Sequence, residues 1–76
     1  MPTTFKKLDV HPLIAKSIEP FSEIRARIDR LASDEGLSVI APFLPSPLIE
    51  KLKSEGFQSR IKRQAGSWIT HFWREN

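Results

Sequence analysis

The chain holds few residues of the kinds that catalyse reactions, and their spacing does not assemble a reactive group. It has no cysteine, so it can form neither a thiolate nucleophile nor a disulfide. Ser17 could act as a nucleophile beside a base, but it lies outside any Gly-x-Ser-x-Gly context. We expect Ser17 to be a loop hydroxyl or a helix cap. We therefore predict no catalytic residue and no enzyme activity.

Metal and cofactor sites are not predicted either. His11 and His71 are the two histidines, and they lie on the predicted first and last strands without the close spacing of a metal motif. Glu19 and Glu23 suit the ordinary role of carboxylates in the first turn of a helix. The three glycines fall at predicted turns, so no phosphate-binding loop is present.

The more informative pattern is an aromatic and basic set near the C-terminus. If Trp68 and Phe72 point toward the core, strand alternation turns Ile69, His71 and Trp73 to the opposite face. That face would carry an apolar patch with basic groups from the neighbouring strand, where Gln58 also falls. Such patches mark interaction sites when they are large, although small domains always leave some apolar surface exposed. The predicted partner-binding residues are Arg60, Lys62, Ile69, His71 and Trp73.

Charge is distributed unevenly along the chain. The formal net charge is +3, and residues 1–50 carry six basic and seven acidic groups, whereas residues 51–76 carry six basic and two acidic groups. This asymmetry suits either an anionic partner or a solvated surface. The alternative function is RNA binding, with bases stacked on aromatic rings between basic side chains. The residues in question are Lys51, Lys53, Arg60, Lys62, Arg63 and Arg74, together with Trp68, Phe72 and Trp73.

Six elements are expected to position these residues in one domain of 76 residues. Residues 4–10 read as a strand, 13–18 as a loop, 19 or 20 to 32 as a helix with an apolar stripe, and 37–43 as a second strand. Ser46 is predicted to cap a short second helix that ends before Gly56. Residues 57–64 and 67–74 read as strands joined at Ala65-Gly66.

The order β-α-β-α-β-β predicts an α+β fold. A right-handed first crossover makes the first two strands parallel. Two helices on one face of a four-stranded mixed sheet then give a two-layer sandwich.

We expect a cytoplasmic protein. No apolar run reaches the ~18 residues of a membrane span, and the segment after Lys6-Lys7 lacks the apolar stretch of a signal peptide. The absence of cysteine fits a reducing compartment. The expected partner is another protein or a second copy of the chain, with nucleic acid as the alternative and no membrane.

Several short motifs, taken in order, resemble the bacterial TusA/SirA-like family, and more closely a cysteine-less set known as a SirA-like domain of unknown function. The motifs are Leu8-Asp9-Val10, Glu19-Pro20-Phe21, Gly36, Pro47-Leu48, Gly56-Phe57 and Gly66-Ser67-Trp68. The order of elements also resembles the C-terminal domain of a bacterial translation initiation factor. The resemblance implies a single SirA/TusA-like domain over residues 1–76.

TusA-like sulfur carriers hold a Cys-Pro-x-Pro motif at the start of their first helix. The matching stretch here is Ser17-Ile18-Glu19-Pro20, in which serine replaces the cysteine. Serine cannot carry a persulfide, so the resemblance implies the fold without the sulfur chemistry. The positive helix end would remain, but Glu19 is expected to occupy its free N–H groups.

Overall fold

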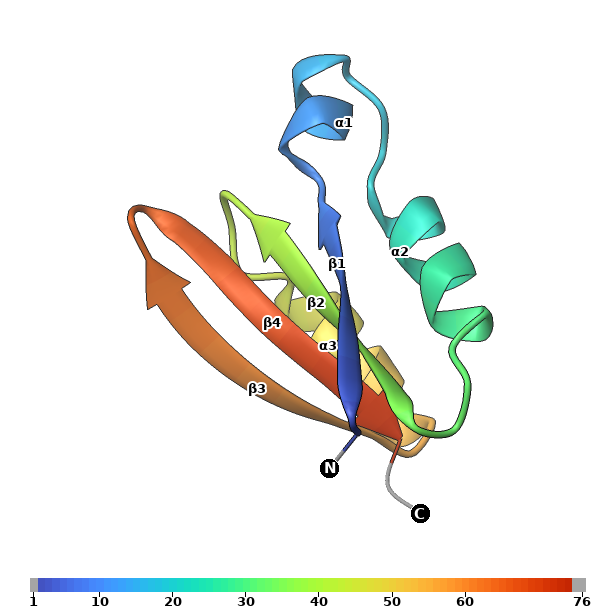
Figure 1. Cartoon of the computed structure of the whole chain (residues 1–76). Helices are drawn as coiled ribbons and strands as arrows, with labels where there is room; N and C mark the ends of the chain where they lie inside the picture. Colours follow the sequence, from blue (N-terminus) through green and yellow to red (C-terminus); the bar gives the residue numbers. More distant parts are fainter. Residues whose placement is uncertain (1, 75–76) are drawn as a thin grey trace.

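The computed structural model describes residues 2–74 and shows a sheet packed against helices (Figure 1). The elements are β1 (Thr4–Asp9), α1 (His11–Ala15), α2 (Phe21–Asp29), β2 (Glu35–Ala41), α3 (Ser46–Ser54), β3 (Phe57–Gln64) and β4 (Ser67–Arg74). The strands form one mixed sheet in the order β1-β2-β4-β3. This confirms the predicted α+β class and the four-stranded mixed sheet.

The sheet order places the last strand in the interior. β1 and β2 are parallel, since the chain crosses over through α1 and α2 between them. β4 lies between β2 and β3 and is antiparallel to both. β1 and β3 are therefore the edge strands, and the side chains of β4 have a neighbouring strand on each side.

Strand alternation divides the sheet into an inner and an outer face. Across the inner face, Leu8 pairs with Val39 and Val39 pairs with Thr70. The buried residues of α2 and α3 join this face in a single core, so both helices cover the same side. The opposite side is called the outer face below. The core consists of Leu8, Val10, Ile24, Ile28, Leu37, Val39, Ala41, Leu48, Leu52, Phe57 and Phe72.

Helix α2 begins where Glu19 accepts hydrogen bonds from the first free N–H groups. The Glu19 carboxylate accepts from the main-chain N–H of Phe21, and from both the main-chain N–H and the hydroxyl of Ser22, at 3.1 Å and 2.9 Å. The helix ends at Asp29, earlier than the predicted residue 32. Tight i→i−3 bonds from Arg30 to Arg27 and from Leu31 to Ile28 turn the chain out of the helix.

The predicted loop at residues 13–18 was partly wrong, because α1 begins at His11 and includes Leu13 to Ala15. Pro12 suits the first turn of a helix, and Asp9 Oδ1 accepts the His11 main-chain N–H at 2.9 Å. A single turn of helix has no repeating apolar stripe, so periodicity could not reveal it.

Two other local predictions were wrong. The second strand begins and ends two residues early, since it spans Glu35–Ala41 and Pro42 cannot donate to a ladder. Phe43 instead stacks on Phe21, with ring centroids 6.1 Å apart. Ser46 is the first helical residue of α3, with no side-chain cap on that helix.

The hairpin turn offers a first test of local backbone strain. Ala65 and Gly66 have φ of +51° and +80°, and a two-residue turn of this kind needs positive φ at both positions. We expect Ala65→Asn to raise the free energy of unfolding by about 0.5–1 kcal/mol, because asparagine tolerates the left-handed region better than alanine. Urea unfolding measures the change. Gly66→Ala is the control, and it should lower stability.

Candidate functional site

Three rings from two strands gather on the outer face and are called the aromatic cluster below: Phe5, His71 and Trp73. The Phe5 ring meets His71 and Trp73 edge to face, with centroids 5.2 Å and 6.1 Å away. These three residues and Arg60 line a pocket of about 190 Å³. All three rings are partly exposed, so the cluster forms an open apolar surface beside a guanidinium group.

His71 lies at the centre of this face and is held by a hydroxyl group. Its Nδ1 lies 2.7 Å from Ser38 Oγ on the neighbouring strand. Partial burial lowers the pKa of His71, and the positive charges of Lys62 and Arg60 lower it further. The imidazole is therefore neutral at neutral pH and can both donate and accept a hydrogen bond.

The structure brings the five predicted partner-binding residues together on the outer face. Arg60 pairs across the ladder with His71, and Lys62 pairs with Ile69. Lys7 lies on the same face beyond Ser38. Among residues 2–74, none of these three cations forms an ion pair. The outer face therefore combines exposed rings with unneutralised positive charge.

Sequence reasoning missed Phe5 and Gly36. Phe5 pairs with Gly36, which in turn pairs with Trp73, so the Phe5 ring lies over the strand between them. The signal for Phe5 was present, since Leu8 points inward and alternation sends Phe5 outward. The contact of Phe5 with Trp73 across β2 could not be predicted from the sequence, because it depends on the order of strands in the sheet.

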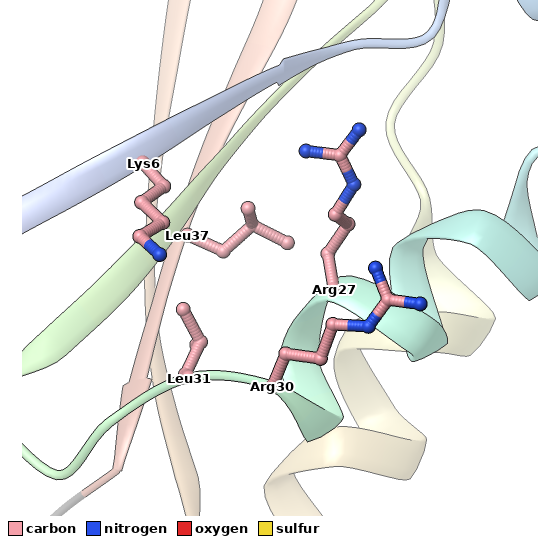
Figure 2. A pocket seen from close by; sticks show the side chains of 5 residues that line it. All are labelled: Lys6, Arg27, Arg30, Leu31 and Leu37. Carbon is pink, nitrogen blue, oxygen red and sulfur yellow. The ribbon is translucent and has the colours of Figure 1, made fainter.

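A second basic pocket lies between β1 and the end of α2 (Figure 2). Its volume is about 150 Å³, and Lys6, Arg27 and Arg30 surround Leu31 and Leu37. Arg27 Nε bonds to a carboxylate one turn earlier in α2, at 2.9 Å. Lys6 is also paired, with Glu35, so two of the three cations are neutralised. This pocket therefore attracts an anion less strongly than the outer face does.

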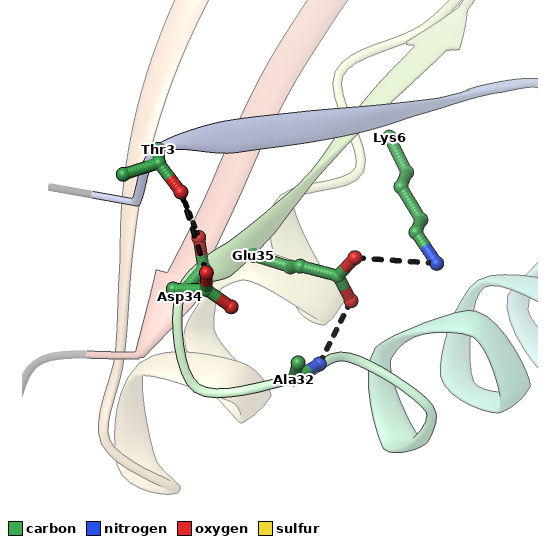
Figure 3. A network of polar contacts seen from close by, with 5 residues as sticks. All are labelled: Thr3, Lys6, Ala32, Asp34 and Glu35. Carbon is green, nitrogen blue, oxygen red and sulfur yellow. Dashed lines mark hydrogen bonds and ion pairs between the residues drawn. The ribbon is translucent and has the colours of Figure 1, made fainter.

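The carboxylate that neutralises Lys6 also fixes the loop after α2 (Figure 3). Glu35 lies 3.4 Å from the Lys6 ammonium and accepts the main-chain N–H of Ala32 at 2.9 Å. That N–H, and then Lys6, lowers the pKa of Glu35. The Thr3 hydroxyl donates to the main-chain oxygen of Asp34 at 3.3 Å, as Figure 3 shows. The main-chain N–H of Thr3 donates to the same oxygen at 3.0 Å. The network is structural, because it ties the start of β1 to the loop before β2.

The segment that matches the sulfur-carrier motif forms an exposed corner between α1 and α2. Ser17 has φ +58° and lies in the turn before Pro20, the N-cap position of α2. Of the two roles predicted for Ser17, the loop hydroxyl is therefore confirmed and the helix cap is wrong. Ile18 is 48% exposed. The prediction that Glu19 occupies the helix N–H groups is confirmed by its bonds to Phe21 and Ser22.

An aspartate, a histidine and a serine meet at the end of β1. Asp9 Oδ1 lies 2.6 Å from His11 Nδ1, and His11 Nε2 lies 3.4 Å from Ser67 Oγ. The main-chain N–H of His11, and then its ring, lowers the pKa of Asp9. An activated serine needs its base within about 2.6–3.2 Å. The separation of 3.4 Å is longer than this, and the contacts through His11 join the end of β1 to the start of β4.

The two histidines have separate partners, His11 with Asp9 and His71 with Ser38. Within residues 2–74, no group of three or more histidine, aspartate or glutamate side chains is arranged to hold a metal ion. In the same part of the chain, none of the helices has the length and apolar character needed to cross a membrane.

Fold and site together define a small two-layer α+β domain with one helix-free sheet face that carries rings and cations. Residues 7–74 match the model of an uncharacterised conserved protein family, DUF2249, and the chain belongs to that family. Comparison with curated proteins and with solved structures gives no significant match.

Proposed function

We propose that this chain is a non-catalytic binding domain that recognises another protein through its outer face. The observation that carries the proposal is the aromatic cluster, which remains partly exposed because both longer helices cover the opposite side of the sheet. Tryptophan and arginine are the residues most enriched at binding hot spots. Trp73 and Arg60 line the same pocket here.

Charge indicates what kind of partner fits. Asp9 is the sole carboxylate that the described strands place on this face, and it is engaged with His11. Arg60, Lys62 and Lys7 would favour a partner surface that combines acidic and apolar groups. Two copies meeting face to face would bring these cations together, so a different protein fits better than a second copy.

RNA binding is the weaker alternative because the cations do not follow one track. Arg63 covers the ring of Trp68 at 5.2 Å, and Arg74 covers Phe57 at 5.1 Å. Both rings belong to the inner face, and Lys51 and Lys53 lie on α3. A single strand held by stacking needs rings and cations side by side in one groove.

The resemblance to TusA/SirA-like domains forms part of the proposal. It is supported by the order of the strands and longer helices and by Glu19-Pro20 immediately before α2. Because it has no cysteine, the domain would not carry sulfur and would instead bind another protein, in the bacterial cytoplasm.

The test is a titration with a partner identified by affinity capture and then purified. We expect Trp73→Ala to weaken binding by about 2 kcal/mol, or roughly thirtyfold, because a large aromatic ring that becomes buried in an interface often acts as a hot spot. Ile18→Ala is the matched control, since it shortens an exposed apolar side chain away from the outer face. Calorimetry measures both affinities.

Two results would contradict the proposal. Loss of binding in Ile18→Ala with full binding in Trp73→Ala would move the site to the corner between α1 and α2. Tight binding of single-stranded RNA that falls steeply with salt would favour the alternative. Sedimentation of wild type and Trp73→Ala tests whether the partner is a second copy.

A further inference from the structure

Strand β3 is exposed to an unusual degree for a strand of eight residues. Seven of its residues are exposed, and Phe57 alone is buried. Ile61 is 44% exposed although it points to the side of the sheet that carries the helices. Nothing in residues 2–74 pairs with the far edge of β3, because the sheet order ends there.

The free edge presents main-chain groups at regular intervals. Gln64 and Ser67 close a two-residue turn, and such a closing pair exchanges both of its hydrogen bonds. Hydrogen-bonded and non-hydrogen-bonded pairs then alternate along the ladder, so the main-chain groups of Lys62 and Arg60 are hydrogen-bonded to β4. The N–H groups of Ser59, Ile61 and Arg63 point outward. The pairing runs without a bulge from Phe57 to Gln64, so no bulge interrupts the row of outward main-chain groups that another strand would meet.

The charges of β3 select what can pair with this edge. Arg60 and Lys62 project on the outer face and Arg63 on the inner face. Cations on an edge strand prevent it from pairing with a copy of itself, because like charges placed opposite one another are destabilising. The same cations favour a strand that carries carboxylates, above all on the face beside Arg60 and Lys62.

The other edge strand offers less. β1 spans six residues, and its Leu8 is buried. Lys6 is paired with Glu35, and Asp9 with His11. Lys7 is then the one charged side chain of β1 outside an ion pair, so the free charge of β1 is smaller than that of β3.

We infer that the free edge of β3 accepts an acidic extended segment of another protein as a fifth strand of the sheet. Main-chain hydrogen bonds would supply affinity, and Arg60, Lys62 and Arg63 would supply the preference for acidic sequences. Arg60 and Lys62 would serve both proposals, but the main-chain edge of β3 is separate from the three rings of the aromatic cluster. Variants of Trp73 and of Ile61 therefore let this inference and the proposed function fail independently.

The experiment uses a synthetic peptide of alternating glutamate and valine, with the same length as β3, and the full chain labelled for NMR. We expect peptide binding to slow hydrogen exchange at the amides of Ser59, Ile61 and Arg63, which the free edge leaves open to water. A peptide of alternating lysine and valine should produce no change. This measurement needs no variant, so it does not depend on the folding of a mutant.

A matched pair of variants tests the edge directly. Ile61→Pro removes an outward N–H without breaking the ladder to β4, and proline is tolerated on edge strands in that position. It should weaken peptide binding about tenfold, whereas Ile61→Thr, which keeps the N–H, should bind nearly as wild type does. Circular dichroism verifies that both variants fold.

The inference is overturned if the glutamate peptide protects none of these three amides. It is equally overturned if a folded Ile61→Pro binds as tightly as Ile61→Thr. If the chain bound single-stranded RNA but not the glutamate peptide, the cations of β3 would be assigned to nucleic-acid binding instead.

Discussion

Phe72→Ala is expected to remove most of the stability of this domain. Phe72 has no exposed surface, lies on β4, one of the two interior strands, and belongs to the core that includes residues of both longer helices. Replacing a buried phenylalanine by alanine costs about 3–5 kcal/mol in lost burial and cavity formation. A domain of 76 residues has a total stability of roughly 4–11 kcal/mol. Urea unfolding followed by tryptophan fluorescence should show a large fall in the midpoint, or a chain already unfolded in buffer.

The matched control is Phe21→Ala, the same chemical change at a ring that is 39% exposed. It should cost about 1 kcal/mol or less, because that ring loses only its stacking on Phe43 and part of its burial. A small effect of Phe72→Ala together with a large effect of Trp73→Ala would contradict the structure. That outcome would mean that β4 pairs one residue out of register, since such a slip exchanges the two faces.

The sequence predicted the faces of β4 because alternation is a local property. Phe72 and Trp73 are neighbours, and one must face the core when the other faces out. The same logic placed Arg60 and Lys62 beside His71 and Ile69, as the register of the hairpin confirms. A two-residue turn fixes that register, so a short stretch of sequence was enough.

What the sequence could not show depends on contacts between distant segments. Phe5 reaches Trp73 across Gly36, and His11 reaches Ser67, only because β4 lies next to β2. Sequence order alone does not state which strands are neighbours. The sequence also does not predict how exposed β3 is, since that depends on how far the helices extend across the sheet.

Gly36→Ala is expected to be the most damaging change on the outer face. A Cβ atom at this position would meet the Phe5 ring, with Cδ1 at 2.6 Å, and the main-chain oxygen of Phe72 at 2.8 Å. Alanine normally stabilises a strand relative to glycine by about 0.5–1 kcal/mol. The overlap should reverse that sign and cost about 1–3 kcal/mol, because the Phe72 oxygen is main chain and cannot rotate away.

A double-mutant cycle separates the two contacts of the added methyl group. Gly36→Ala should be milder by about 1 kcal/mol when Phe5→Ala is also present, since the ring is gone while the Phe72 oxygen remains. Gly56→Ala is the control: its φ of +94° makes alanine unfavourable with nothing nearby to clash, so its cost should not depend on Phe5. Urea unfolding of the single and double variants gives the coupling energies. Full additivity between Gly36→Ala and Phe5→Ala would mean that the Phe5 ring does not lie over Gly36, and the aromatic cluster would then lose the contact that joins β1 to β4.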